Sequence, residues 1–137
     1  MRIPNRPNRR GVAIVEAAIV LPIVIFMLLA IVLGASLVFT QQEVATLARE
    51  GTRYASVHGA DYALYTGNAP ATSDDVYNNS ILPRMMTLDQ SRVSYSVTWN
   101  TDNRPGNTVI VTLNYTWSAP ILGDVSLSST SKATVSY

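Results

Sequence analysis

The chain of 137 residues contains no cysteine and only one histidine. The lack of cysteine excludes disulfide bonds, thiol nucleophiles and thiolate metal ligands, and it leaves the redox compartment undetermined. The sequence also lacks a phosphate-binding glycine loop, a nucleophile elbow, a paired His and Glu zinc motif and a dinucleotide fingerprint. There is room for one membrane segment and one small domain, which makes a large catalytic domain unexpected. These absences predict a non-enzymatic protein with no cofactor and no small-molecule substrate.

Charge is scarce and unevenly distributed. Charged residues make up only 14% of the chain, and none occurs from Ala17 to Gln42. Four arginines lie before this stretch, at positions 2, 6, 9 and 10, whereas acids slightly outnumber bases after it. The basic surface that nucleic-acid binding requires is therefore missing, and we expect no nucleic acid among the partners.

The apolar run from Gly11 to Phe39 carries a single charge, Glu16. Its uncharged part is longer than the roughly 20 residues that cross a hydrocarbon core of about 30 Å. The alternative is a cleaved secretory signal, whose apolar region has only about 7 to 15 residues. Because arginines gather on the cytoplasmic side of a span, the N-terminus is expected inside the cell. The prediction is a single-pass protein with a basic leader 1–11, a transmembrane helix 12–40 and an extracytoplasmic domain 41–137.

Two features of the run could serve assembly. A carboxylate within a span costs about 2 to 3 kcal/mol, so Glu16 is a functional candidate that needs a partner. The alternative is that Glu16 lies among lipid headgroups, where its negative charge stabilises the positive N-terminal end of the helix dipole. The small residues Gly34, Ala35 and Ser36 would let another helix approach closely, although they could equally face lipid.

A basic leader that ends in glycine, a glutamate five residues later and an early proline in the apolar helix resemble the N-terminus of type IV prepilins. The stretch RRGVAIVEAAIVLP is most similar to the TadE family of pseudopilins, which belong to the Flp/Tad pilus system. The stretch ATLAREGTRYASVHG is similar to the segment that follows the span in TadE-like proteins. The resemblance covers the chain well up to residue 60, and beyond that only as a helix followed by strands.

The resemblance implies a prepilin peptidase cut between Gly11 and Val12. It also implies that Glu16 meets the freed amine of Val12 in a neighbouring subunit, where opposite charges would fix the register of packed helices. Ala17 departs from the tyrosine that is common after the glutamate in Tad-type sites. A cleaved leader and a retained leader therefore both stay open.

From Gln41 to Val57 the periodicity predicts that the helix continues beyond the membrane. One stripe of this segment includes the small residues Ala48, Gly51 and Ala55, against which another element can pack closely. A sheet of the same domain is the favoured partner, and a neighbouring subunit is the alternative. His58 is expected at the surface or near the helix end, and Glu50 and Arg53 share one face of the helix.

The segment from Gly59 to Ser73 reads as a loop. After it, Thr72 or Ser73 is expected to cap a short helix, with Asp74 and Asp75 in its first turn. A calcium site at the two aspartates is the weaker alternative, because the ligand spacing of a dedicated loop is absent. Pro83 either ends this helix at Leu82 or kinks it before it resumes through Met86.

The last third of the chain has the alternation of strands. Apolar residues alternate with polar ones in 92–99 and 108–117, and the turn TDNRPGN between them predicts a hairpin. The segment from Ala119 to Asp124 crosses over to a weaker third strand within 125–137. We therefore predict an α+β fold in which a long N-terminal helix packs against a small antiparallel sheet of about three strands, as in pilins.

Three functions remain open from the sequence. The favoured one is a non-catalytic TadE-like pseudopilin of the bacterial inner membrane, which takes part in assembling a Flp/Tad pilus for adhesion or secretion. Its partners would be the membrane, other pilins or pseudopilins, the Tad machinery and a prepilin peptidase. The second is a membrane-anchored binding or adhesive module that joins no pilus. The third is a small membrane enzyme, for which no residue set after Phe39 indicates a reaction.

Overall fold

The structure is a computed structural model that describes residues 9–119 and 123–136. The first element is the helix α1, Arg9–Val57, and the other helices are short. The chain divides into two compact units, of which one ends at Ser36 and the other begins at Leu37. The mixed α+β class expected from the sequence is confirmed, with one long apolar helix and one three-stranded antiparallel sheet.

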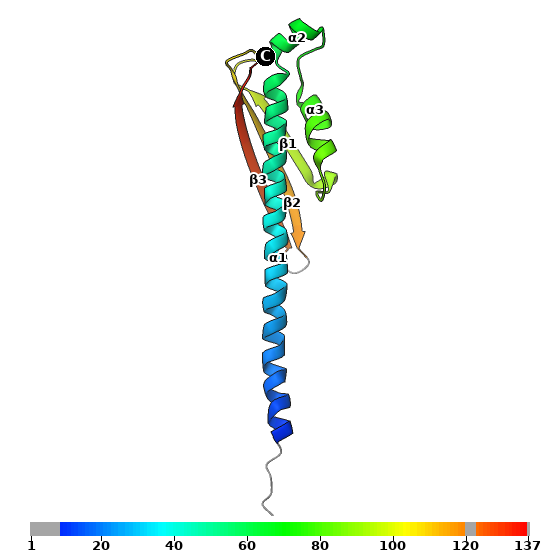
Figure 1. The fold of residues 1–137 in the computed structure, drawn as a ribbon, viewed down its shortest axis with the longest axis vertical. Helices are drawn as coiled ribbons and strands as arrows, with labels where there is room; N and C mark the ends of the chain where they lie inside the picture. The colour runs from blue at the N-terminus through cyan, green and yellow to red at the C-terminus, as the bar shows by residue number, and fades with distance from the viewer. Residues whose placement is uncertain (1–8, 120–122, 137) are drawn as a thin grey trace, which may run out of the picture. The chain divides into compact units, whose positions relative to one another are not determined.

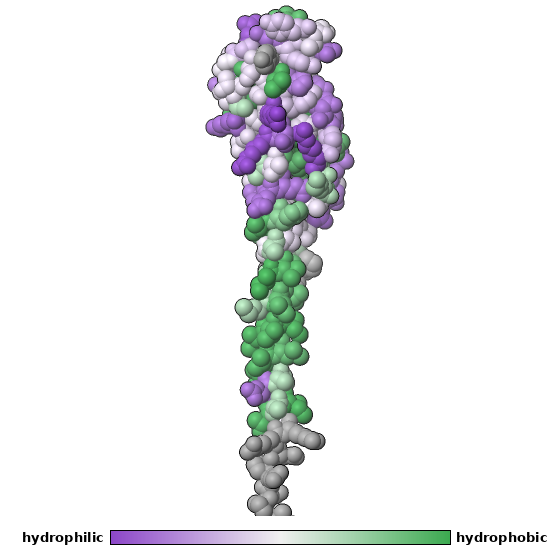
Figure 2. All heavy atoms as spheres, viewed as in Figure 1, coloured by the Kyte–Doolittle hydropathy of each residue, from purple (hydrophilic) through white to green (hydrophobic). Residues whose placement is uncertain are grey.

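In the first unit, α1 exposes nearly all of its side chains. Every residue from Gly11 to Ser36 is exposed except the partly buried Leu33, and the helix continues through Pro22. Figure 2 shows hydrophobic residues gathered along the first part of α1 and hydrophilic residues over much of the second unit. A helix that is apolar on all sides requires either lipid or other protein around it.

In the second unit, the sheet has the order β1-β2-β3 and all pairs are antiparallel. The strands are β1, Val93–Trp99, β2, Thr108–Ala119, and β3, Gly123–Thr134. Val97 pairs with Val111 across the first hairpin, which confirms the predicted hairpin. The pairing of β2 with β3 reaches Ala119 and Gly123, so the third strand follows as an adjacent antiparallel neighbour rather than after a crossover. Residues 120–122 of the expected crossover lie outside the described residues.

The core lies between the last part of α1 and one face of the sheet (Figure 1). Apolar and polar residues alternate along the strands, so the apolar side chains point toward α1 and the polar ones point away, as the sequence pattern predicted. The larger apolar side chains that are fully buried come from helix, connecting segment and strands alike: Val44, Ile81, Val76, Val109, Val111, Leu113 and Val135.

The segment between α1 and the sheet differs from the expected loop. Residues Ala60–Thr66 form a helix, α2, so the prediction of a loop from Gly59 to Ser73 is wrong there. Gly67 lies in the left-handed region at φ 73°, and its N–H donates to the Ala63 carbonyl. It therefore acts as the C-cap of the helix, a position where glycine is favoured.

The second short helix, α3, is Ser73–Val76, and Thr72 is its N-cap. The chain then passes through a π-helical turn, η1, Tyr77–Ile81, and a 3-10 turn, η2, Leu82–Arg84, which contains Pro83. The helix therefore neither stops at Leu82 nor resumes through Met86. Instead it tightens into η2 and ends where Met85 becomes extended. A further 3-10 turn, η3, Gln90–Arg92, leads into β1.

Candidate assembly site

Residues near the start of α1 include the predicted processing site and the lone carboxylate. Gly11 and Val12 both lie within the helix, and Val12 is 70% exposed. Val12 and Glu16 are four residues apart, so they share one face, where Val15 and Gly11 complete a shallow hollow. Glu16 is exposed, and it has no ion pair or hydrogen bond with any side chain that the structure describes.

The small residues Gly34, Ala35 and Ser36 form an open surface on the same helix. All three are exposed, and a Cβ added to Gly34 would have no neighbour within 4 Å. The Ser36 hydroxyl donates to the Leu33 carbonyl at 2.8 Å, so it is satisfied by its own helix. At Gly34 the backbone of another helix could approach closely, because no side chain lies there.

The other small residues predicted to pack, Ala48, Gly51 and Ala55, lie in the core of the second unit. Ala48 and Ala55 are fully buried, and a Cβ at Gly51 would lie 3.3 Å from the Val111 Cγ1 atom of β2. This part of α1 is therefore covered by the sheet of its own domain. The sequence analysis above favoured this sheet over a neighbouring subunit as the packing partner. The two sets of small residues differ in surroundings, since only the set at 34–36 is open.

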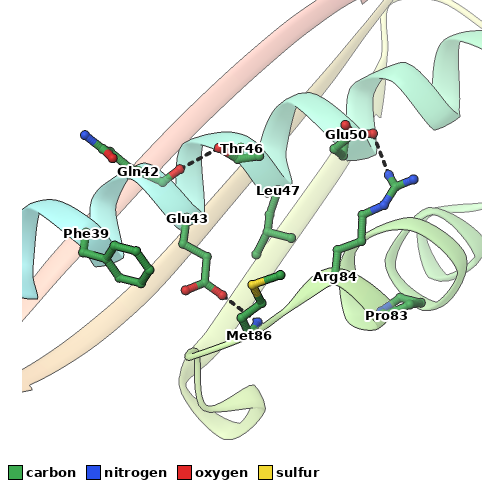
Figure 3. A pocket seen from close by; sticks show the side chains of 9 residues that line it. All are labelled: Phe39, Gln42, Glu43, Thr46, Leu47, Glu50, Pro83, Arg84 and Met86. Carbon is green, nitrogen blue, oxygen red and sulfur yellow. Dashed lines mark hydrogen bonds and ion pairs between the residues drawn. The ribbon is translucent and has the colours of Figure 1, made fainter.

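The second unit also contains a groove that no sequence pattern predicts. It has a volume of about 490 Å³ and contains both apolar and charged side chains (Figure 3). Its lining residues are Phe39, Gln42, Glu43, Thr46, Leu47, Glu50, Pro83, Arg84 and Met86. In the view of Figure 3 the side chains of Phe39 and Met86 lie on either side of Glu43. Phe39 is 55% exposed and Met86 is 88% exposed.

Glu43 fixes the loop that forms one side of this groove. Its Oε1 atom accepts from the backbone N–H of Met86 at 2.7 Å and of Thr87 at 3.0 Å. Its Oε2 atom accepts from the Thr87 hydroxyl. A single carboxylate thus satisfies two successive backbone donors and one side chain from a segment more than forty residues away. Nothing local in the sequence indicates this contact, because the loop has no periodicity of its own.

A second contact joins the same two segments. Glu50 and Arg84 form an ion pair at 2.5 Å, with 31% and 56% of their side chains exposed. The sequence placed Glu50 and Arg53 on one face, but it is Arg84, from η2, that pairs with Glu50. The position of Arg84 depends on the 3-10 turn at Pro83, which helical spacing alone does not predict.

His58 lies in an aromatic stack at the end of α1. Its ring is 4.0 Å from that of Tyr54 and 4.5 Å from that of Tyr62, and its Nδ1 atom is 2.9 Å from the Tyr54 carbonyl oxygen. The imidazole therefore joins α1 to α2. This position agrees with the expected place near the helix end.

The two aspartates of α3 serve separate structural contacts. Asp75 forms a capping box with Thr72, and the side-chain hydrogen bond from Thr72 lowers the pKa of the Asp75 carboxyl. Asp74 accepts from the Tyr95 hydroxyl at 2.7 Å, and this bond raises the pKa of Tyr95. In the residues that the structure describes, no three His, Asp or Glu side chains gather in a way that could hold a metal ion. The capping interpretation of Thr72 and Asp75 is confirmed.

Comparison with known proteins agrees with the geometry at the start of the chain. Within the described parts of the chain, one helix is long and apolar enough to cross a membrane. No curated protein and no solved structure matches the chain. The model of the family described as TadE-like protein matches residues 11–53. The matched segment starts at Gly11, contains Glu16 and ends within the buried stripe of α1. The resemblance to the TadE-like family is thereby confirmed over residues 11–53.

Proposed function

We propose that this chain is a non-catalytic TadE-like pseudopilin, anchored in the bacterial inner membrane, that takes part in assembling a Flp/Tad pilus for adhesion or secretion. The N-terminus would lie in the cytoplasm, and the domain after residue 40 would lie in the periplasm or outside the cell. Its partners would be the membrane, other pilins or pseudopilins and the Tad machinery. The family match and the apolar, exposed first part of α1 support this proposal.

The observation that carries the proposal is the position of Glu16. It is the one acidic residue of the apolar run, it is exposed, and it lies within the segment that matches the TadE-like family. A carboxylate at this depth needs a partner, and an ammonium group in a low-dielectric interface is the chemically matched one. An axial shift that separates the two partners would leave each charge uncompensated, which is strongly unfavourable. Such a pair therefore fixes the axial register of packed helices.

Processing would supply the ammonium group. A cut between Gly11 and Val12 would free the Val12 amine and remove the leader with its four arginines. Val12 and Glu16 share one helix face. The amine of one subunit could therefore meet the carboxylate of a neighbour when two helices pack with a small axial offset. The open surface at Gly34, Ala35 and Ser36 would allow the same helices to approach farther along.

The test replaces Glu16 in cells that make the pilus. Glu16→Ala should abolish assembly while the protein still inserts in the membrane, whereas Glu16→Asp should retain part of it. Glu50→Ala is the matched control, because Glu50 lies on the same helix but pairs with Arg84 of its own domain. Normal piliation by Glu16→Ala would count strongly against the pairing role and favour a membrane-anchored adhesive module outside the pilus.

Mass spectrometry of the mature protein tests the processing step separately. The expected N-terminal residue is Val12 in membranes that contain the cognate prepilin peptidase. An intact Met1 in those membranes would refute cleavage and leave the membrane anchor in place.

A further inference from the structure

One face of α1 stays uncovered in the second unit, and it carries two arginines. Gln42, Thr46, Arg49 and Arg53 are exposed and follow one another at helical spacing, opposite the buried stripe of the same segment. Neither arginine forms an ion pair with any side chain that the structure describes. Side chains four residues apart lie about 5 to 6 Å from each other on a helix, so the two positive charges repel each other.

The acids of α1 that lie nearest to these arginines are already engaged. The Glu50 carboxylate pairs with Arg84. The Glu43 carboxylate accepts hydrogen bonds from the backbone N–H groups of Met86 and Thr87. The arginine pair is therefore an exposed positive surface, and an anionic partner must come from outside this helix.

The helix α3 carries a surface of the opposite charge. Asp74 and Asp75 are both exposed, and each is held in place through one carboxylate oxygen. Oδ1 of Asp74 accepts from the Tyr95 hydroxyl at 2.7 Å, and Oδ2 of Asp75 accepts from the Thr72 hydroxyl at 2.7 Å. The other oxygen of each carboxylate has no hydrogen bond or ion pair within the described part of the chain. Two fixed negative charges thus also lack a basic partner.

The two charged surfaces lie at one level of the second unit. The Ser73 hydroxyl, adjacent to Asp74 in the chain, donates to the Val97 carbonyl at 3.4 Å. Val97 pairs with Val111, and Val111 contacts α1 at Gly51, midway between the two arginines. This row of contacts runs across the sheet from α3 to α1, and Figure 1 shows α3 beside the last part of α1. Two copies placed side by side therefore bring unlike charges together without a shift along α1.

We propose that a second copy of the chain docks its Asp74 and Asp75 against Arg49 and Arg53. The planar guanidinium fork matches a carboxylate bidentately. Exposed ion pairs contribute little affinity, but complementary charges select the partner and its orientation. Because every copy carries both surfaces, the contact is heterologous and can repeat from copy to copy. It concerns the second unit alone, so it holds or fails independently of the proposed pairing of Glu16.

The absence of cysteine in the chain makes a direct test possible. Two full-length chains, Thr46→Cys and Asn78→Cys, place one thiol near the arginines and one near the aspartates, both at exposed positions. The chains carry different affinity tags, are mixed in a nonionic detergent and are treated with a short bismaleimide. Leu64→Cys in place of Asn78→Cys gives the background from random collisions, because Leu64 is 81% exposed in the same unit.

The product that joins residues 46 and 78 should form in several-fold higher yield than the product that joins residues 46 and 64. Equal yields of these two products would overturn the inference. A main product between two copies of residue 46 would also overturn it, because the arginine surfaces would then face each other.

Replacing the arginines tests whether charge holds the copies together. Arg49→Gln with Arg53→Gln in the Thr46→Cys chain should lower the yield several-fold, toward the background, and high salt should lower it in the native chain. Arg104→Gln is the matched control, because Arg104 is exposed and pairs with Asp102 of its own loop. It should leave the yield unchanged. Circular dichroism confirms that each variant is folded. An unchanged yield without the two arginines would overturn the proposed contact.

Discussion

Gly51 and Ile81 are in such close contact that a Cβ at Gly51 would lie 3.1 Å from the Cδ1 atom of Ile81. The same Cβ would lie 3.3 Å from the Cγ1 atom of Val111. Ile81 and Val111 are both fully buried, so neither side chain has free space to move into. The absence of a side chain at this helical position therefore sets how closely α1 approaches η1 and the sheet.

Substitutions at Gly51 should separate helix propensity from packing. Gly51→Ala gains about 1 kcal/mol of helix propensity, and a contact near 3.1 Å offsets most of it, so the change in unfolding free energy should stay within about 1 kcal/mol. Gly51→Val adds two further methyl groups and should lower the unfolding free energy by about 2 to 3 kcal/mol. Chemical denaturation of the full chain in detergent measures both. Equal stability of the valine variant and the native chain would contradict this packing.

Gly34 lies on the same helix as Gly51, but its surroundings are open rather than closely packed. A Cβ there has no neighbour within 4 Å, so Gly34→Leu should leave the unfolding of the second unit unchanged. If another helix packs against this surface, the bulky side chain should reduce cross-linking between neighbouring subunits in native membranes several-fold. Gly34→Ala is the matched control. Full cross-linking by Gly34→Leu would indicate that the surface faces lipid.

The ion pair between Glu50 and Arg84 should contribute little to stability. Both side chains are partly exposed, and exposed pairs are worth about 0 to 1 kcal/mol. Glu50→Gln should therefore lower the unfolding free energy by less than about 1 kcal/mol, and by less still in high salt. Denaturation at two salt concentrations tests this. A loss larger than this range would mean that the pair is more shielded from water than its exposure indicates.

The capping box of α3 should make part of the stability depend on acid. The side-chain hydrogen bond from Thr72 lowers the pKa of Asp75 in the folded chain. The carboxylate therefore stabilises the fold above its unfolded pKa of about 3.9, and this contribution is lost as the pH falls through the lower folded value. Thr72→Ala should raise the pKa of Asp75 toward its ordinary value, as measured by NMR titration. Asp75→Asn should flatten the stability curve in the acid range, and an unchanged curve would refute the assignment.

Local patterns predicted the regular elements well. Period and charge placed the long helix, because a helix reveals its buried face through the spacing of Val44, Leu47 and Ala48. Alternation placed the strands to within a few residues, and the cap at Thr72 followed from the residue types around it. The helix α2 was missed because it is short, lacks a buried face and ends in a glycine that also occurs in loops.

The groove could not be predicted because its contacts are not local. Glu43 bonds to Met86 and Thr87, and Glu50 pairs with Arg84, across separations that no periodicity describes. The conformation of η1 and η2 determines which residues meet α1. The candidate residues near the start of α1 were different, since Glu16 stood out as a lone charge in an apolar run. Their proposed partners still lie outside a single chain.

The burial of Val135, close to the last described residue, determines when the domain can fold. It is buried, its N–H donates to the Asn107 carbonyl at 2.8 Å, and the next residue, Ser136, donates to the Ser56 carbonyl at 2.8 Å. During synthesis from the N-terminus, the α1 stripe is made long before these residues. The core cannot close until Val135 has been added, so the partly synthesised domain presents an apolar surface that a chaperone could bind.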